Sequence, residues 1–188
     1  MTAFVLGNGK SRNGIDLFAL RKYGEIYGCN ALYRDFEPDV LVSTDPAISK
    51  EIQMSGWPRG RRHYTRKPFL ESGSFPLSPE YKGMSSGPNA LNIACKDGHN
   101  RIFLIGFDLG SVNPVFNNVY ADTKFYKKST DSATFGGNWL NHIIRIMAEN
   151  ADVHFTRVIS NESRLEDKLK SIPNLDFMHK DQFVDAHK

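Results

Sequence analysis

The chain has 188 residues, of which 40% are hydrophobic and 24% are charged, with a formal net charge of +3. These values are ordinary for a soluble globular protein and predict one domain, residues 1–188, with room for a proper core. They give no reason to expect nucleic-acid binding from overall charge, and no apolar run is long enough for a transmembrane helix.

Strands and helices alternate almost throughout the predicted secondary structure. Asp45 followed by Pro46 is a typical start of a helix, and so is serine before Pro88. The alternation predicts a Rossmann-like α/β fold, with a mainly parallel sheet covered by helices on both faces. In chain order we expect a strand at 2–6, a helix at 15–23, strands at 25–30 and 39–43, a helix at 47–54, an irregular stretch at 55–83 with a short strand near 62–65, a helix from 85 to 94 or 96, a strand at 101–105, a lid-like polar excursion at 111–134, a helix at 139–149, a strand at 153–159, a short charged helix at 162–170 and a C-terminal segment.

The first strand runs into a Gly7-Asn8-Gly9 turn, followed by Lys10 and Ser11. Glycines let backbone N–H groups approach an anion closely, so the turn predicts phosphate or nucleotide binding, with a plain strand–turn–helix connection as the alternative. The dinucleotide fingerprint is excluded because Arg12 stands where its third glycine belongs. A Walker A loop is excluded because its first glycine would fall at Phe4.

Small polar residues follow the other predicted strands as well. In a parallel sheet these residues meet at one edge, where ligands bind. Each alone also suits a cap or a turn, but together they predict a site for ribose hydroxyls, a base edge and phosphates. With the turn, the set comprises Asn30, Ser43, Thr44, Asp45, Ser85, Ser86, Gly87, Gly106 and Asp108.

The order of these motifs resembles the bacterial lipooligosaccharide sialyltransferases, Rossmann-like enzymes that use CMP-sialic acid. Their pattern reads Gly-Asn-Gly-Pro-Ser, Cys-Asn, Thr-Ser-Gly and Gly-Ile-Asp. Here the matching stretches are 7–11, 29–30, 85–87 and 106–108, and more loosely 120–124. The chain is also similar to a wider Rossmann-like group that includes the archaeal pterin pyrophosphokinases, which the stretch 38–43 and Asp45 suit well.

The resemblance implies roles for single residues. Asn8 and Asn30 would contact the nucleotide, with Ser86 and Gly87 near its ribose and phosphates. Tyr120 would donate a hydrogen bond to the leaving phosphate, and Lys10, which replaces the proline of the turn, could reach a phosphate. The family's general base is a histidine in a Gly-His pair, which this chain lacks. The remaining candidate bases are His142, Asp122 and His63.

Two other functions stay open. One is a phosphotransferase of the pterin pyrophosphokinase type, in which Asp45 and Asp108 would hold Mg²⁺ against substrate phosphates. The other is a non-catalytic nucleotide- or nucleic-acid-binding module. It would use a basic stretch that can also attract an acidic or phosphorylated substrate, with a solvated loop or edge strand as the plain alternative. That stretch contains Arg59, Arg61, Arg62, His63, Arg66 and Lys67, interleaved with Tyr64 and preceded by Trp57.

Cys29 and Cys95 are the only cysteines and lie among apolar or small residues. We therefore expect two buried thiols instead of a disulfide. Free thiols are typical of the cytoplasm, and the N-terminal residues lack a signal-peptide pattern, so we expect a cytoplasmic protein. The sequence allows a homo-oligomer.

Overall fold

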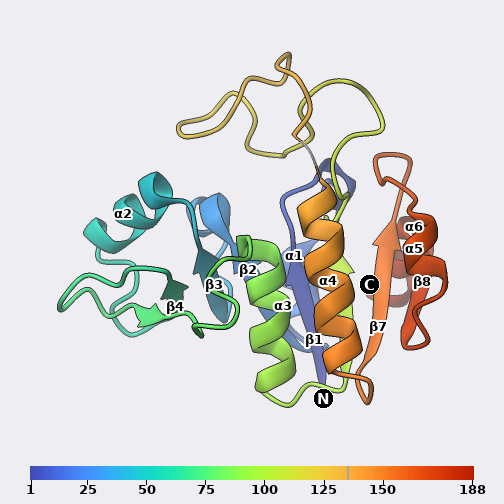
Figure 1. Ribbon diagram of the computed structural model, residues 1–188, viewed down its shortest axis with the longest axis horizontal. Coiled ribbons are helices and arrows are strands. Elements are labelled where there is room, and N and C mark those ends of the chain that lie inside the picture. Colours follow the sequence, from blue (N-terminus) through green and yellow to red (C-terminus); the bar gives the residue numbers. More distant parts are fainter. Residues whose placement is uncertain (135) are drawn as a thin grey trace.

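A computed structural model describes residues 1–134 and 136–188 (Figure 1). In these residues eight strands form one sheet, in which all neighbouring strands are parallel. The strands are β1 (Thr2–Leu6), β2 (Glu25–Cys29), β3 (Val40–Ser43), β4 (Arg62–Thr65), β5 (Phe75–Pro76), β6 (Arg101–Ile105), β7 (His154–Ile159) and β8 (Leu175–His179). The helices are α1 (Leu17–Leu20), α2 (Pro46–Met54), α3 (Ser86–Lys96), α4 (Gly137–Glu149), α5 (Asp167–Lys170) and α6 (Lys180–Ala186), with short 3-10 helices η1 (Lys10–Arg12) and η2 (Asn30–Arg34). The predicted Rossmann-like α/β class is confirmed.

The strand order is β5-β4-β3-β2-β1-β6-β7-β8. The six strands β3-β2-β1-β6-β7-β8 follow the Rossmann order 3-2-1-4-5-6, and β4 and β5 extend the sheet beyond β3. The chain runs outward from β1 to β5, and then α3 carries it back across β1, β2 and β3 so that β6 pairs on the other side of β1. The direction of winding therefore changes between β1 and β6, and ligands bind at such a point in Rossmann folds.

Alternating residues of the buried strands supply two cores, one on each face of the sheet. On one face Ala3, Val5 and Leu104 pack against α3, α4 and α5. On the other face Phe4 and Phe103 pack against α1, α2 and α6. Figure 1 shows α3 and α4 side by side in front of β1, with the strands rising from the N-terminus toward the end where the segment 111–134 lies.

Several elements differ in length from the sequence prediction. The helix expected at 15–23 is shortened to α1, where Asp16 caps the N-terminus by accepting hydrogen bonds from the N–H groups of Phe18 and Ala19. The charged helix expected at 162–170 is reduced to α5. The C-terminal segment forms β8 and α6, and β5 was also not expected. Both unexpected strands lie at sheet edges and expose most of their side chains. Their sequences therefore lack the long apolar run by which a buried strand is predicted.

The predictions of two buried free thiols at Cys29 and Cys95 are confirmed. Within the described ranges, every helix is too short or too polar to span a bilayer.

Candidate functional site

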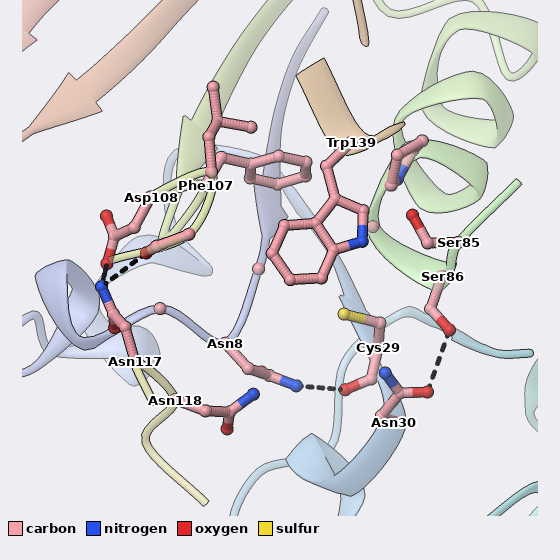
Figure 2. Close-up of a pocket in the computed structure, with 17 residues that line it drawn as sticks. Asn8, Cys29, Asn30, Ser85, Ser86, Phe107, Asp108, Asn117, Asn118 and Trp139 are labelled. Carbon is pink, nitrogen blue, oxygen red and sulfur yellow. Dashed lines mark hydrogen bonds between the residues drawn. The ribbon is translucent and has the colours of Figure 1, made fainter. Parts of the chain in front are cut away.

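A pocket with about 620 Å³ of open space, its mouth included, lies at the C-terminal edge of the sheet (Figure 2). It sits where β1 and β6 end, at the change in winding direction. The lining comes from residues 7–9 after β1, 29–30 at the end of β2, 85–88 at the start of α3, 106–110 after β6, 117–118, and Trp139 of α4.

The Gly7-Asn8-Gly9 turn is packed tightly against the loop that follows β6. A Cβ atom on Gly7 would lie 2.5 Å from the carbonyl oxygen of Gly106, and one on Gly9 would lie 2.7 Å from the same oxygen. The N–H of Gly7 donates to Ile105 O at 2.7 Å, and that of Gly9 donates to Gly106 O at 2.9 Å. The glycines therefore serve the contact between two loops, and these two N–H groups are not free to bind an anion.

Asp108 joins the same two loops to a third segment. Its carboxylate, which is only 3% exposed, accepts the N–H of Ser11 at 3.0 Å and the side-chain amide of Asn117 at 3.2 Å on one oxygen. The other oxygen accepts the hydroxyl of Ser163 at 3.1 Å. Asn117 in turn accepts the N–H of Lys10 at 2.8 Å. Both oxygens of Asp108 are thus engaged inside the protein.

A fully buried arginine lies behind this loop. Arg157 of β7 donates through Nε and Nη2 to the carbonyl oxygen of Phe107, at 3.1 and 2.9 Å. Burial lowers the pKa of its guanidinium to about 10, while the negative charge of Asp108 acts in the opposite direction. Arg157 therefore holds the loop after β6 from below, and Asp108 compensates part of its charge.

Asn8 and Asn30 both lie at the pocket, where their side chains also tie it together. The amide of Asn8 donates to Cys29 O at 3.1 Å, and its oxygen accepts from Arg12 at 3.4 Å. Asn30 accepts the hydroxyl of Ser86 at 2.9 Å and adopts a left-handed backbone, with φ of 54°. No described residue accepts a hydrogen bond from Nδ2 of Asn30, so this amide group can donate to a ligand.

The start of α3 offers further donors. Ser85 is the N-cap residue, but its hydroxyl makes no capping bond, and Oγ is buried without a partner among the described residues. The first backbone N–H that bonds back is that of Asn89, which donates to Ser85 O at 3.2 Å. The N–H groups of Ser86 and Gly87 precede it and have no acceptor in the described chain. Figure 2 shows Ser85 and Ser86 at the pocket wall next to Trp139.

The rest of the lining is neutral and partly aromatic. Trp139 and Phe107 form one wall, and the ring of Phe107 lies against Gly87, where a Cβ would be 3.3 Å from it. Burial raises the pKa of the Cys29 thiol to about 12, so this group stays protonated and is a poor nucleophile. Neither lysine nor arginine is among the lining residues.

Ser43, Thr44 and His63 do not line the pocket, and neither do six further predicted site residues. Three of them stabilise neighbouring structure through hydrogen bonds of their own: Lys10 and Ser11 through their N–H groups, and Asp45 as the N-cap of α2. The other three are the predicted catalytic residues Tyr120, Asp122 and His142.

Tyr120 is buried in the core on the α1, α2 and α6 face. Its hydroxyl accepts from Arg12 at 3.1 Å, and burial raises its pKa. Asp122 is exposed and accepts the N–H of Ser129 at 2.9 Å, which lowers its pKa. His142 is half-buried on α4, where burial lowers its pKa. These three side chains are therefore not brought together at the pocket.

The segment 111–134 forms no helix or strand in its described residues, as expected for an excursion, but it is anchored at several points. The N–H of Val119 donates to Asn8 O at 2.8 Å, and the N–H of Ala31 donates to the hydroxyl of Tyr126 at 3.3 Å. Asn117 and Asn118 of this segment reach the pocket wall (Figure 2).

The basic stretch is largely engaged in contacts within the protein. Arg61 pairs with Glu37, and Arg62 pairs with Asp97, both at 2.9 Å. Arg66 donates to the carbonyl oxygens of Lys82 and Met84. His63 is fully buried between Ser43 and Ser74, at 2.7 Å from each hydroxyl. Arg59 and Lys67 are the two exposed cations of the stretch that make no ion pair with any described residue.

Sequence reasoning missed the aromatic wall and the two asparagines of the excursion. Trp139 is the third residue of α4, where a hydrophobic side chain reads as core. Asn117 and Asn118 stand in a polar stretch with no periodic pattern, so only the asparagine pair itself was a signal. No family model matches the chain, and no curated protein or solved structure is similar enough to it to count as a match.

Proposed function

We propose that the pocket binds a nucleotide, with the CMP part of a nucleotide sugar as the favoured ligand, and that the chain is a sialyltransferase-like glycosyltransferase. The observation that carries the binding proposal is the start of α3. There, Ser86 and Gly87, whose N–H groups have no acceptor in the described chain, and Ser85, whose buried hydroxyl has no partner, line a pocket at the change in winding direction of the sheet. That combination suits a phosphate group.

The charge of the lining supports a phosphate group at the start of α3. A helix N-terminus carries about half a positive charge, so the N–H groups of Ser86 and Gly87 favour an anion even though no basic side chain lines the pocket. Asp108 is the only carboxylate in the lining, and its oxygens already accept three hydrogen bonds. The neutral amides of Asn30 and Asn118 then suit the uncharged base and ribose.

Glycosyl transfer rests on the resemblance of the motifs alone. In that reaction the bond between the anomeric carbon and the phosphate oxygen breaks, its electron pair leaves with CMP, and an acceptor hydroxyl bonds to the carbon and loses its proton. Hydrogen bonds to the leaving phosphate stabilise the charge that develops. The start of α3 could supply them, whereas Tyr120 lies outside the lining.

Isothermal titration calorimetry against CMP, the other nucleoside monophosphates and CMP-sialic acid tests the binding proposal. We expect Ser85→Asp to lower the affinity for CMP at least tenfold, because a carboxylate would lie beside the phosphate. The affinity for uncharged cytidine should not change. Aspartate is a good N-cap, so the variant should fold. Ser78→Asp, at an exposed serine outside the lining, is the matched control and should leave both affinities unchanged.

Absence of binding by every nucleotide and nucleotide sugar would refute the proposal. Equal affinity of the wild type and Ser85→Asp for CMP would refute the placement of the phosphate at the start of α3.

A further inference from the structure

We infer that Trp139 binds the base of the nucleotide, by stacking its indole ring on the base and donating a hydrogen bond from Nε1. This inference rests on the proposed function and extends it, because it places the base against α4 and the phosphate at the start of α3. Neither the motifs nor the resemblance assigns a role to Trp139.

The backbone is built to bring Trp139 over the pocket. Gly136, the N-cap of α4, lies so close to the carbonyl oxygen of Leu109 that a Cβ atom would overlap with it. Leu109 itself has a left-handed backbone, with φ of 60°, which is uncommon for leucine. The loop after β6 and the first turn of α4 are thus held in close contact, which places Trp139 at the pocket wall opposite Asn30 (Figure 2).

Packing against the core accounts for only part of the surface of this tryptophan. The buried stripe of α4 consists of Leu140, Ile143, Ile146 and Met147. Trp139 lies on the same side of the helix, four residues before Ile143, but it is only partly buried against the core. Its ring therefore keeps surface that faces the pocket.

The indole N–H is also available. No described residue accepts a hydrogen bond from Nε1, and this atom is not among the buried polar atoms without a partner, so a solvent molecule or ligand can reach it. An exposed aromatic face next to free amide donors is the arrangement that recognises a planar heterocycle, since the face stacks and the amides bond to the ring edge. The absence of lysine and arginine from the lining favours an uncharged ring at this wall.

Tryptophan fluorescence gives a direct test, because the chain has two tryptophans and Trp57 does not line the pocket. In a Trp57→Phe background, Trp139 is the only reporter. We expect CMP and cytidine to change its emission and ribose 5-phosphate, which lacks a base, to leave it unchanged. Stacking of one base corresponds to roughly 5- to 150-fold in affinity. Trp139→Leu should therefore weaken CMP binding by that factor in calorimetry, and Trp139→Phe, which keeps a ring but loses the N–H, should weaken it less.

The outcomes separate the two proposals. If the wild type binds CMP but Trp139→Leu binds it equally well and the emission does not change, the role of Trp139 is refuted and nucleotide binding stands. If no nucleotide binds the wild type, both are refuted. Trp57→Phe alone should keep the wild-type affinity, and thermal unfolding of each variant shows whether it is folded. If Trp139→Leu does not fold, the emission change and Trp139→Phe decide.

Discussion

Replacement of Asp108 tests whether this carboxylate clamps the loops around the pocket. In Asp108→Ala the buried N–H of Ser11 loses its acceptor, which alone costs about 1–3 kcal/mol, and two further hydrogen bonds to a charged group are lost. Asn117 keeps its bonds to Gly110 O and Glu162 O, so the losses do not simply add. We expect the free energy of unfolding to fall by about 3–5 kcal/mol.

Asp108→Asn should cost much less. Its oxygen can still accept from Ser11 and Asn117, and its amide group can donate to the hydroxyl of Ser163, which rotates to accept. Only the negative charge is lost, and with it part of the compensation for the charge of buried Arg157. We therefore expect the free energy of unfolding to fall by about 1–2 kcal/mol.

Urea unfolding followed by circular dichroism measures both values. In thermal unfolding, about 2–4 °C per kcal/mol for a chain of this size predicts a drop of roughly 6–20 °C for Asp108→Ala. Asp152→Ala, at an exposed position, is the control and should stay within about 0.5 kcal/mol of the wild type. The reasoning is refuted if Asp108→Ala costs less than about 1 kcal/mol, or if Asp108→Asn costs as much as Asp108→Ala.

Two further predictions concern the loop contact and a buried histidine. Gly9→Ala should lower the free energy of unfolding by about 2–3 kcal/mol, because its Cβ would overlap the carboxylate of Asp108, whereas Gly83→Ala, with open space around it, should stay near zero; equal costs in urea unfolding would contradict the close approach. Burial lowers the pKa of His63 to about 4, below its unfolded value, so its stabilising contribution is complete above about pH 6.5 and is lost as the pH falls toward 4. We expect the wild type to lose roughly 3 kcal/mol more than His63→Gln between pH 7.5 and 4, and parallel pH profiles for the two proteins would rule this out.

The centre of the fold was predictable because its strands are buried on both faces. Val40–Ser43 and Arg101–Ile105 are continuous or nearly continuous apolar runs, and the structure places strands at both. The edge strand Leu175–His179 was missed because it buries only its first residue well. Pairing with β7 defines this strand, and pairing partners leave no local mark in the sequence.

The candidate site was predictable in position but not in the role of each residue. A parallel sheet brings strand ends together, so Asn8, Asn30 and Asp108 could be placed at one edge before the structure was known. In the sequence, a carboxylate that binds a ligand and one that accepts hydrogen bonds from three protein groups look the same after a strand. Only the contacts of Asp108 in the structure distinguish the two cases. Trp139 was missed for the opposite reason, since an aromatic residue in line with a buried helix stripe is typical of a core residue.

The Gly7-Asn8-Gly9 turn shows why the same sequence signal can have two physical causes. Glycine is required wherever a backbone must approach something closely, and an anion and a second loop satisfy that condition equally. Here the second loop is present: Gly106 O accepts the N–H of Gly9, and Ile105 O accepts that of Gly7. The N–H groups of Gly7 and Gly9 are therefore not available to an anion, whereas those of Ser86 and Gly87 at the start of α3 have no acceptor in the described chain. Close packing of the two loops forms one wall of the pocket, and under the proposed function the open helix start beside them supplies the donors for the phosphate.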